Sequence, residues 1–155
     1  MNVRIKDPGS AITHFIGMMM AVFASTPLLI KAARQPDQIH MIALGIFITS
    51  MILLYAASTL YHTLDLSEKV NKRLKKLDHM MIFVLIAGTY TPICIIALPQ
   101  PLGIQLLTLV WGIALLGIVQ GIWCGFSDWK NRFSHIIQYR AEFLYNVSLF
   151  WYCRD

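Results

Sequence analysis

The sequence predicts an all-α fold, a polytopic membrane helix bundle with four transmembrane helices. Hydrophobic residues make up 57% of the 155 residues and charged residues only 14%, against roughly 25% charged in ordinary soluble domains. Four runs lack Asp, Glu, Lys and Arg, and each has about 20 residues or more, enough for a helix to cross ~30 Å of hydrocarbon. The runs are residues 11–30, 39–61, 80–98 and 102–126.

The first apolar run, residues 11–30, has features of a secretory signal peptide as well as of a membrane span. Arg4 and Lys6 precede the run, and the residues VFA at 22–24 could be a cleavage site. The run continues past this site to Ile30, however, and further apolar runs follow it. This continuation favours a transmembrane helix over a cleaved leader.

The second and third runs are separated by a loop rich in lysine. Apolar residues recur in this loop at helical spacing: Leu66, Val70, Leu74 and Leu77. The lysines fall between them, which predicts a short amphipathic interfacial helix along the lipid headgroups. Asp65 and Glu68, three residues apart, resemble a capping box at its start. The alternative is that the lysines only retain this loop in the cytoplasm.

Proline residues mark the end of the third run and its connection to the fourth. The sequence PQP at 99–101, followed by Gly103, predicts a tight turn between the two spans. Pro92 lies inside the third run, where it frees a backbone carbonyl that the hydroxyl of Thr89 or Thr91 can satisfy.

The distribution of Lys and Arg predicts the orientation in the membrane. Of the 13 such residues, two precede the first run, five lie in the second loop and four follow the fourth run. The first loop holds Lys31 and Arg34, and the third loop holds none. The positive-inside rule therefore places the amino terminus, the second loop and the tail in the cytoplasm. The net charge of +5 is explained by this topology, and we expect no nucleic acid partner.

The three cysteines do not predict a disulfide framework. Cys94, Cys124 and Cys153 show no C-x-x-C spacing. Cys94 and Cys124 lie inside apolar runs, where a free thiol behaves as a small hydrophobic group.

Five polar residues fall at one predicted depth near the cytoplasmic face. Ser58 and His62 are four residues apart and share one face of the second helix. Asp78 and His79 stand at the start of the third run, and His14 lies near the start of the first. Each also has a structural interpretation: Asp78 can cap the third helix, Ser58 can bond to a carbonyl of its own helix, and His79 can face the headgroups.

These side chains are also of the types that form metal sites. Imidazole binds zinc directly, and a carboxylate can orient a metal-bound water or a ligating imidazole. A catalytic zinc usually has three protein ligands, whereas this depth offers one or two.

The order of motifs resembles the hemolysin III family, the bacterial branch of the progestin and adipoQ receptor superfamily. The motifs are ITHFIG at 12–17, STLYH at 58–62, LDH at 77–79 and LIAGTYTP at 85–92, followed by Trp111. The resemblance covers about residues 8–126. It implies a seven-helix bundle, of which this chain holds the amino-terminal part, and a zinc ion near the cytoplasmic side. His62 would be a metal ligand, and Ser58 and Asp78 would be catalytic residues, with Asp78 holding the zinc-bound water.

The chain departs from the family pattern after the fourth run. The family's other two histidine ligands come from an H-x-x-x-H motif, and no histidine here has another four residues later. Residues 127–155 do not resemble the family's fifth helix, and the apolar part at 143–153 is short for a span. We therefore divide the chain into a transmembrane domain at 1–126 and an atypical tail at 127–155, the product of truncation or a frame shift.

Three functions are compatible with these features. The superfamily also resembles the alkaline ceramidases, which implies zinc-dependent hydrolysis of an amide or ester bond in a membrane lipid. The second is membrane permeabilisation without enzymatic activity, through a homo-oligomer joined by Gly117, Gly121 and Gly125; these glycines can also serve packing inside one chain. The third is a non-functional fragment. All three place the chain in the cell membrane.

Overall fold

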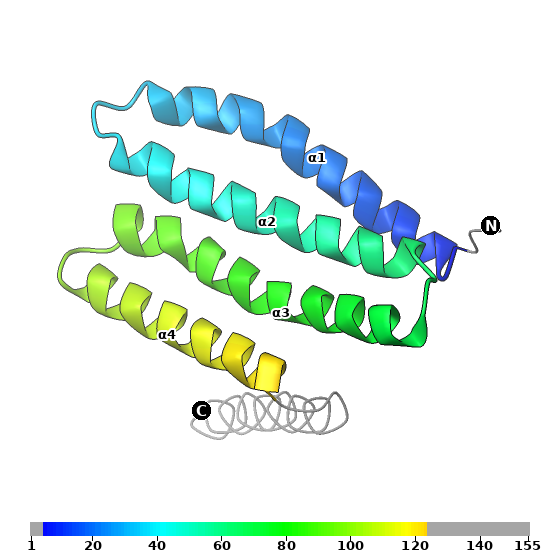
Figure 1. Cartoon of the computed structure of the whole chain (residues 1–155). Helices are drawn as coiled ribbons and strands as arrows, with labels where there is room; N and C mark the ends of the chain where they lie inside the picture. Colours follow the sequence, from blue (N-terminus) through cyan, green and yellow to red (C-terminus); the bar gives the residue numbers. More distant parts are fainter. Residues whose placement is uncertain (1–4, 124–155) are drawn as a thin grey trace, which may run out of the picture. The chain divides into compact units, whose positions relative to one another are not determined.

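The computed structural model describes residues 5–123, which form four α-helices and one π-helical turn. These elements are α1 (Pro8–Ala33), α2 (Ile39–Thr63), α3 (Glu68–Pro92), η1 (Ile93–Ala97) and α4 (Leu102–Trp123). Consecutive helices run in opposite directions and lie beside one another in chain order (Figure 1). The described residues up to Val119 belong to one compact unit.

All four helices are long and apolar enough to cross a membrane. The shortest, α4, has 22 residues, which corresponds to about 33 Å of helix. Large apolar side chains cover the outer faces; for example, Phe23 is 74% and Leu116 is 71% exposed. A lipid environment would cover such side chains, whereas water would not. The predicted all-α architecture with four membrane-spanning helices is thus confirmed.

Small residues allow the helices to approach closely. Ala43 of α2 and Ala87 of α3 are completely buried. A Cβ atom added to Gly88 of α3 would lie 2.7 Å from the Cβ of Ser50 on α2. The Ser50 hydroxyl donates a hydrogen bond to the Phe47 carbonyl of its own helix at 2.7 Å. The α2–α3 contact is therefore of the kind that small residues provide between membrane helices.

Helix α3 begins twelve residues before the predicted apolar run, at Glu68 rather than at Met80. Residues 68–79 continue into the span without a break, so the described residues contain no separate interfacial helix, and that prediction is not confirmed. The reason is the composition of this segment: lysine and leucine are good helix formers, and neither glycine nor proline interrupts it. Asp78 consequently lies inside α3 and does not cap it.

The amino terminus of α3 is capped by Ser67, not by the predicted capping box. The Ser67 hydroxyl accepts a hydrogen bond from the backbone N–H of Val70 at 3.4 Å. Asp65 instead accepts a hydrogen bond from the side-chain amide of Asn71 at 2.8 Å. The box prediction fails because the N-cap is Ser67 and the helix begins two residues later than a box starting at Asp65 requires.

The end of α3 is held by hydroxyl groups. Thr89 donates to the carbonyl of Leu85, and Thr91 to that of Ala87, both at 2.8 Å. The carbonyl that Pro92 leaves free is that of Gly88. Thr91 bonds the carbonyl of the residue before it and Thr89 bonds one three residues before it, so neither hydroxyl fills the predicted gap. Trp111 Nε1 of α4 donates to Thr91 Oγ1 at 3.2 Å, which links α4 to α3.

Candidate functional site

The amino-terminal segment is attached to the end of α2. The backbone N–H of Asp7 donates to the carbonyl of His62 at 3.0 Å. Asp7 Oδ2 also lies 3.2 Å from His62 Nδ1. We call this region, where α1 begins, α2 ends and α3 begins, the His62 end (Figure 1).

Aromatic rings surround the His62 imidazole. The His14 ring of α1 stacks on it with 5.5 Å between centroids and 11° between planes. Tyr61 meets it edge-on at 4.8 Å, and the ammonium of Lys6 lies 3.9 Å from the Tyr61 ring centroid. The His62 side chain is 19% exposed. Two residues from α1 and its approach, Asp7 and His14, thus fix the orientation of His62.

Ser58 is buried one helical turn before His62. Its hydroxyl forms no hydrogen bond within residues 5–123. Ser25 and Ser50, by contrast, donate to carbonyls of their own helices. The alternative that Ser58 bonds back to its helix is therefore wrong, and its hydroxyl is available to a ligand.

The Asp78 side chain, on α3, is 15% exposed. Its carboxylate lies 3.8 Å from His79 Nδ1, and that nitrogen lies 2.7 Å from the Lys75 carbonyl. Neither a hydrogen bond nor an ion pair joins Asp78 to His62 among the described residues. The structure brings His62 together with Asp7 and His14; Ser58 lies one turn before His62 on α2, and Asp78 lies ten residues into α3.

Asp7 was missed by the sequence analysis. It precedes the first apolar run and belongs to no motif, so nothing in its neighbours marked it. The predicted topology contained the signal, because the start of the first span and the end of the second lie on the same side of the membrane.

The described residues do not fit a complete zinc site. Between Ile5 and Trp123, no group of three or more His, Cys, Asp or Glu side chains is placed to hold a metal ion. His62 can supply one ligand, but the stacked His14 and the paired Asp7 do not complete a set with it.

The glycine face of α4 is partly used inside the chain. A Cβ atom added to Gly117 would lie 2.7 Å from the ring of Phe83 on α3. Gly121 lies in the last turn of α4, and Gly125 is outside the described residues. At Gly117, packing within the chain therefore accounts for the small residue.

Four apolar helices of spanning length define the class of protein: it is a multi-pass α-helical membrane protein. Residues 3–153 match the family model described as Haemolysin-III related, and the chain belongs to this family. The matched range includes most of the tail that the sequence analysis set apart at 127–155.

Two curated relatives are similar over 114 residues, which is 74% of this chain. Hemolysin-3 of Bacillus cereus is 42% identical, and the Hemolysin-3 homolog of Bacillus subtilis (strain 168) is 44% identical. The matches cover 52% and 53% of these relatives, so the chain spans about half of their length. No solved structure matches the chain significantly.

Proposed function

We propose that this hemolysin III-like protein acts in zinc-dependent hydrolysis of lipid amide or ester bonds at its His62 end. His62 is a metal ligand, and Ser58 and Asp78 are the catalytic residues. The observation that carries the proposal is the Ser58 hydroxyl, which makes no hydrogen bond inside the described residues and belongs to a buried residue one turn from His62. Among residues 5–123, His62 is the residue that this proposal assigns to the metal, and the described residues do not hold a complete set of ligands.

The catalytic roles follow from the chemistry of the side chains. The Asp78 carboxylate accepts a proton from the water that attacks the carbonyl carbon, and it returns the proton to the leaving amine or alcohol as the C–N or C–O bond breaks. The Ser58 hydroxyl donates a hydrogen bond to the carbonyl oxygen while that oxygen gains negative charge. Low exposure strengthens both interactions, since water does not screen them.

An apolar pocket at the same end supports a lipid substrate. It has a volume of about 360 Å³ and lies between α1 and α2. Its lining includes Pro8, Ile12, Phe15, Thr59 and Thr63. Such a lining suits an acyl chain that enters from the bilayer, and Thr59 and Thr63 directly follow Ser58 and His62 in sequence.

The metal content of the purified full chain tests this proposal. We expect zinc in the wild-type protein and its loss in His62→Ala. His79→Gln is the matched control, because it removes an imidazole of the same helix end that the proposal does not use as a ligand. Equal zinc content in wild type and His62→Ala contradicts the assignment of His62, and so does loss of zinc from the control alone.

A second candidate function is membrane permeabilisation by a homo-oligomer. The names of the two relatives favour it, and the glycine face of Gly117, Gly121 and Gly125 would join the subunits. The contact of Gly117 with Phe83 in the same chain weakens this support. Dye release from liposomes separates the two functions: a pore leaks after metal chelation, whereas a zinc hydrolase loses its activity.

The orientation is part of the proposal. Among residues 5–123, the His62 end carries six basic residues: Lys6, Lys69, Lys72, Arg73, Lys75 and Lys76. The opposite end of the described helices carries only Lys31 and Arg34. By the positive-inside rule the amino terminus and the His62 end face the cytoplasm. Reporter fusions after residue 66 and after residue 36 test this, with cytoplasmic signal expected only for the first.

A further inference from the structure

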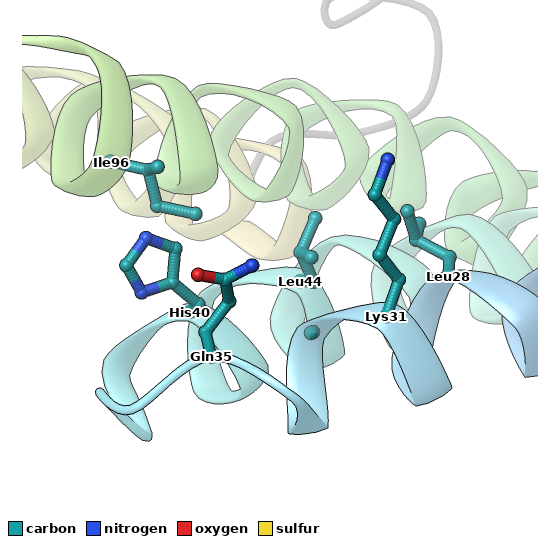
Figure 2. Close-up of a pocket in the computed structure, with 7 residues that line it drawn as sticks. Leu28, Lys31, Gln35, His40, Leu44 and Ile96 are labelled. Carbon is teal, nitrogen blue, oxygen red and sulfur yellow. The ribbon is translucent and has the colours of Figure 1, made fainter.

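A second pocket lies at the opposite end of the same three helices. Here α1 ends, α2 begins and η1 completes α3, and we call this region the His40 end. The pocket has a volume of about 380 Å³. Its walls come from α1, the loop after α1, α2 and η1 (Figure 2). They include Leu28, Lys31, Gln35, His40, Leu44 and Ile96.

Three polar side chains of this pocket have no partner in the part of the chain that the structure describes. His40 Nδ1 is a buried nitrogen without a hydrogen bond. The Lys31 ammonium forms no ion pair or hydrogen bond, and neither does the Gln35 side-chain amide. Lys31 and Gln35 are exposed, so a ligand in the pocket can reach their N–H donors directly, whereas the His40 Nδ1 atom is itself buried.

The charge of the residues that line this pocket indicates the charge of its ligand. No Asp or Glu lines the pocket, whereas lysine, glutamine and histidine all offer N–H donors. Asp37, the acidic residue of the adjoining loop, uses its carboxylate to accept the backbone N–H of Ile39 at 3.0 Å. The polar part of the pocket therefore suits an anion that accepts several hydrogen bonds.

The other half of the lining is aliphatic. Leu28 and Leu44 come from the membrane-spanning helices α1 and α2, and Ile96 extends from η1 toward His40 (Figure 2). A free inorganic anion would leave these side chains without a contact. A ligand that joins an anionic group to a hydrocarbon chain can contact both the polar and the aliphatic part of the lining.

The location at helix ends points to the bilayer as the source of this ligand. Helix termini of membrane spans lie near the headgroup level, where phosphate groups and the first acyl carbons are found. Among the described residues, Lys31 is one of two Lys or Arg residues at this end, on the side that the positive-inside rule depletes of lysine. A role in binding explains why a lysine stands there.

We propose that this pocket binds one anionic phospholipid, with its phosphate held by the exposed donors of Lys31 and Gln35 and an acyl chain against Leu28, Leu44 and Ile96. A zwitterionic choline lipid fits less well, because its ammonium group would lie close to that of Lys31. The site is separate from the proposed catalytic end, and its occupation does not depend on zinc.

Native mass spectrometry of the detergent-solubilised full chain tests the proposal. Phosphatidylglycerol and phosphatidylcholine with identical acyl chains are the probes, and inorganic phosphate without lipid is a third. We expect one phosphatidylglycerol to bind more tightly than phosphatidylcholine. Lys31→Gln should weaken its binding about tenfold or more, since it removes a charge-assisted hydrogen bond.

Two variants control for charge and folding. Arg34→Gln removes one positive charge three residues away, outside the pocket lining, and should change the affinity by no more than about twofold. Lys31→Arg should retain binding. Lys31 is exposed, so its substitution leaves the helix packing intact. Equal binding of the two lipids, equal losses in Lys31→Gln and Arg34→Gln, or binding of inorganic phosphate without lipid preference overturns the proposal.

Discussion

Polar side chains at the two ends of α1–α3 are satisfied in different ways. At the His62 end, Asp7 and His14 both contact His62, so the chain itself fixes the imidazole. At the His40 end, the ring nitrogen of His40 is buried without a partner and Lys31 is unpaired within residues 5–123. A polar side chain whose partners belong to the chain itself suits a site that must keep its geometry. A polar side chain without such partners suits a site that its ligand completes.

The largest expected effect concerns chemistry at the His62 end. Asp78→Asn should lower the rate of lipid amide or ester hydrolysis by about 100-fold or more, because an amide cannot accept the proton of the attacking water. Fatty acid release from a defined detergent-dispersed lipid measures this rate. Asp65→Asn, in the loop before α3, is the control and should retain the rate. If both variants match the wild type, Asp78 has no catalytic role.

The contact between α2 and α3 connects the His62 end with the His40 end. At Gly88 this contact leaves no room for a side chain. Gly88→Ala should lower the free energy of unfolding by about 1–3 kcal/mol, because the new methyl group collides with Ser50. Gly45→Ala is the control, since nothing lies within 4 Å of its Cβ position. Denaturation in mixed micelles gives the free energies. Ser50→Gly should restore part of the loss in Gly88→Ala; without any such recovery, the collision is not the cause.

A buried hydrogen bond near the His40 end offers a more moderate test. Thr91 is 1% exposed and accepts the indole N–H of Trp111. Thr91→Val should cost about 1 kcal/mol, the size found for hydrogen bonds between membrane helices. Trp111→Phe and the double variant complete a cycle. Strictly additive losses would show that the two side chains do not interact.

The smallest effect is expected at the exposed ion pair of the His62 end. Asp7→Ala removes the contact with His62 Nδ1, and Asp7 makes no side-chain cap to α1. The change in unfolding free energy should stay below about 1 kcal/mol, because Asp7 is half exposed. A loss larger than that of Thr91→Val would reverse the ranking of the two contacts.

The membrane spans could be predicted because apolarity is a property of each residue and needs no knowledge of neighbours in space. The start of α3 could not, since apolarity marks contact with lipid and not the extent of a helix. Helix α3 continues for twelve residues into the basic segment, where helix propensity and the Ser67 cap determine its start.

Only those candidate residues that belong to sequence motifs could be predicted. Ser58, His62 and Asp78 belong to motifs; Ser58 and His62 lie in the last two turns of α2, whereas Asp78 lies inside α3 and not at its start. The pairing of His62 with Asp7 depends on how the segment before α1 meets the end of α2. The pocket at His40 depends on how the turn after α1 folds against η1. Such contacts arise from tertiary structure and leave no periodic pattern in the sequence.

Because of the π-helical turn η1, the pocket lining at the His40 end can change without a change at the His62 end. The wider coil of η1 sits between Pro92 and the turn to α4, and it carries Ile96 to the pocket. Removing one residue from this turn would rotate the side chains that follow by about 100°. The rest of α3, including Asp78, would keep its place. Evolution or an engineer could thus change which lipid this pocket accepts without touching the residues at the far side of the membrane.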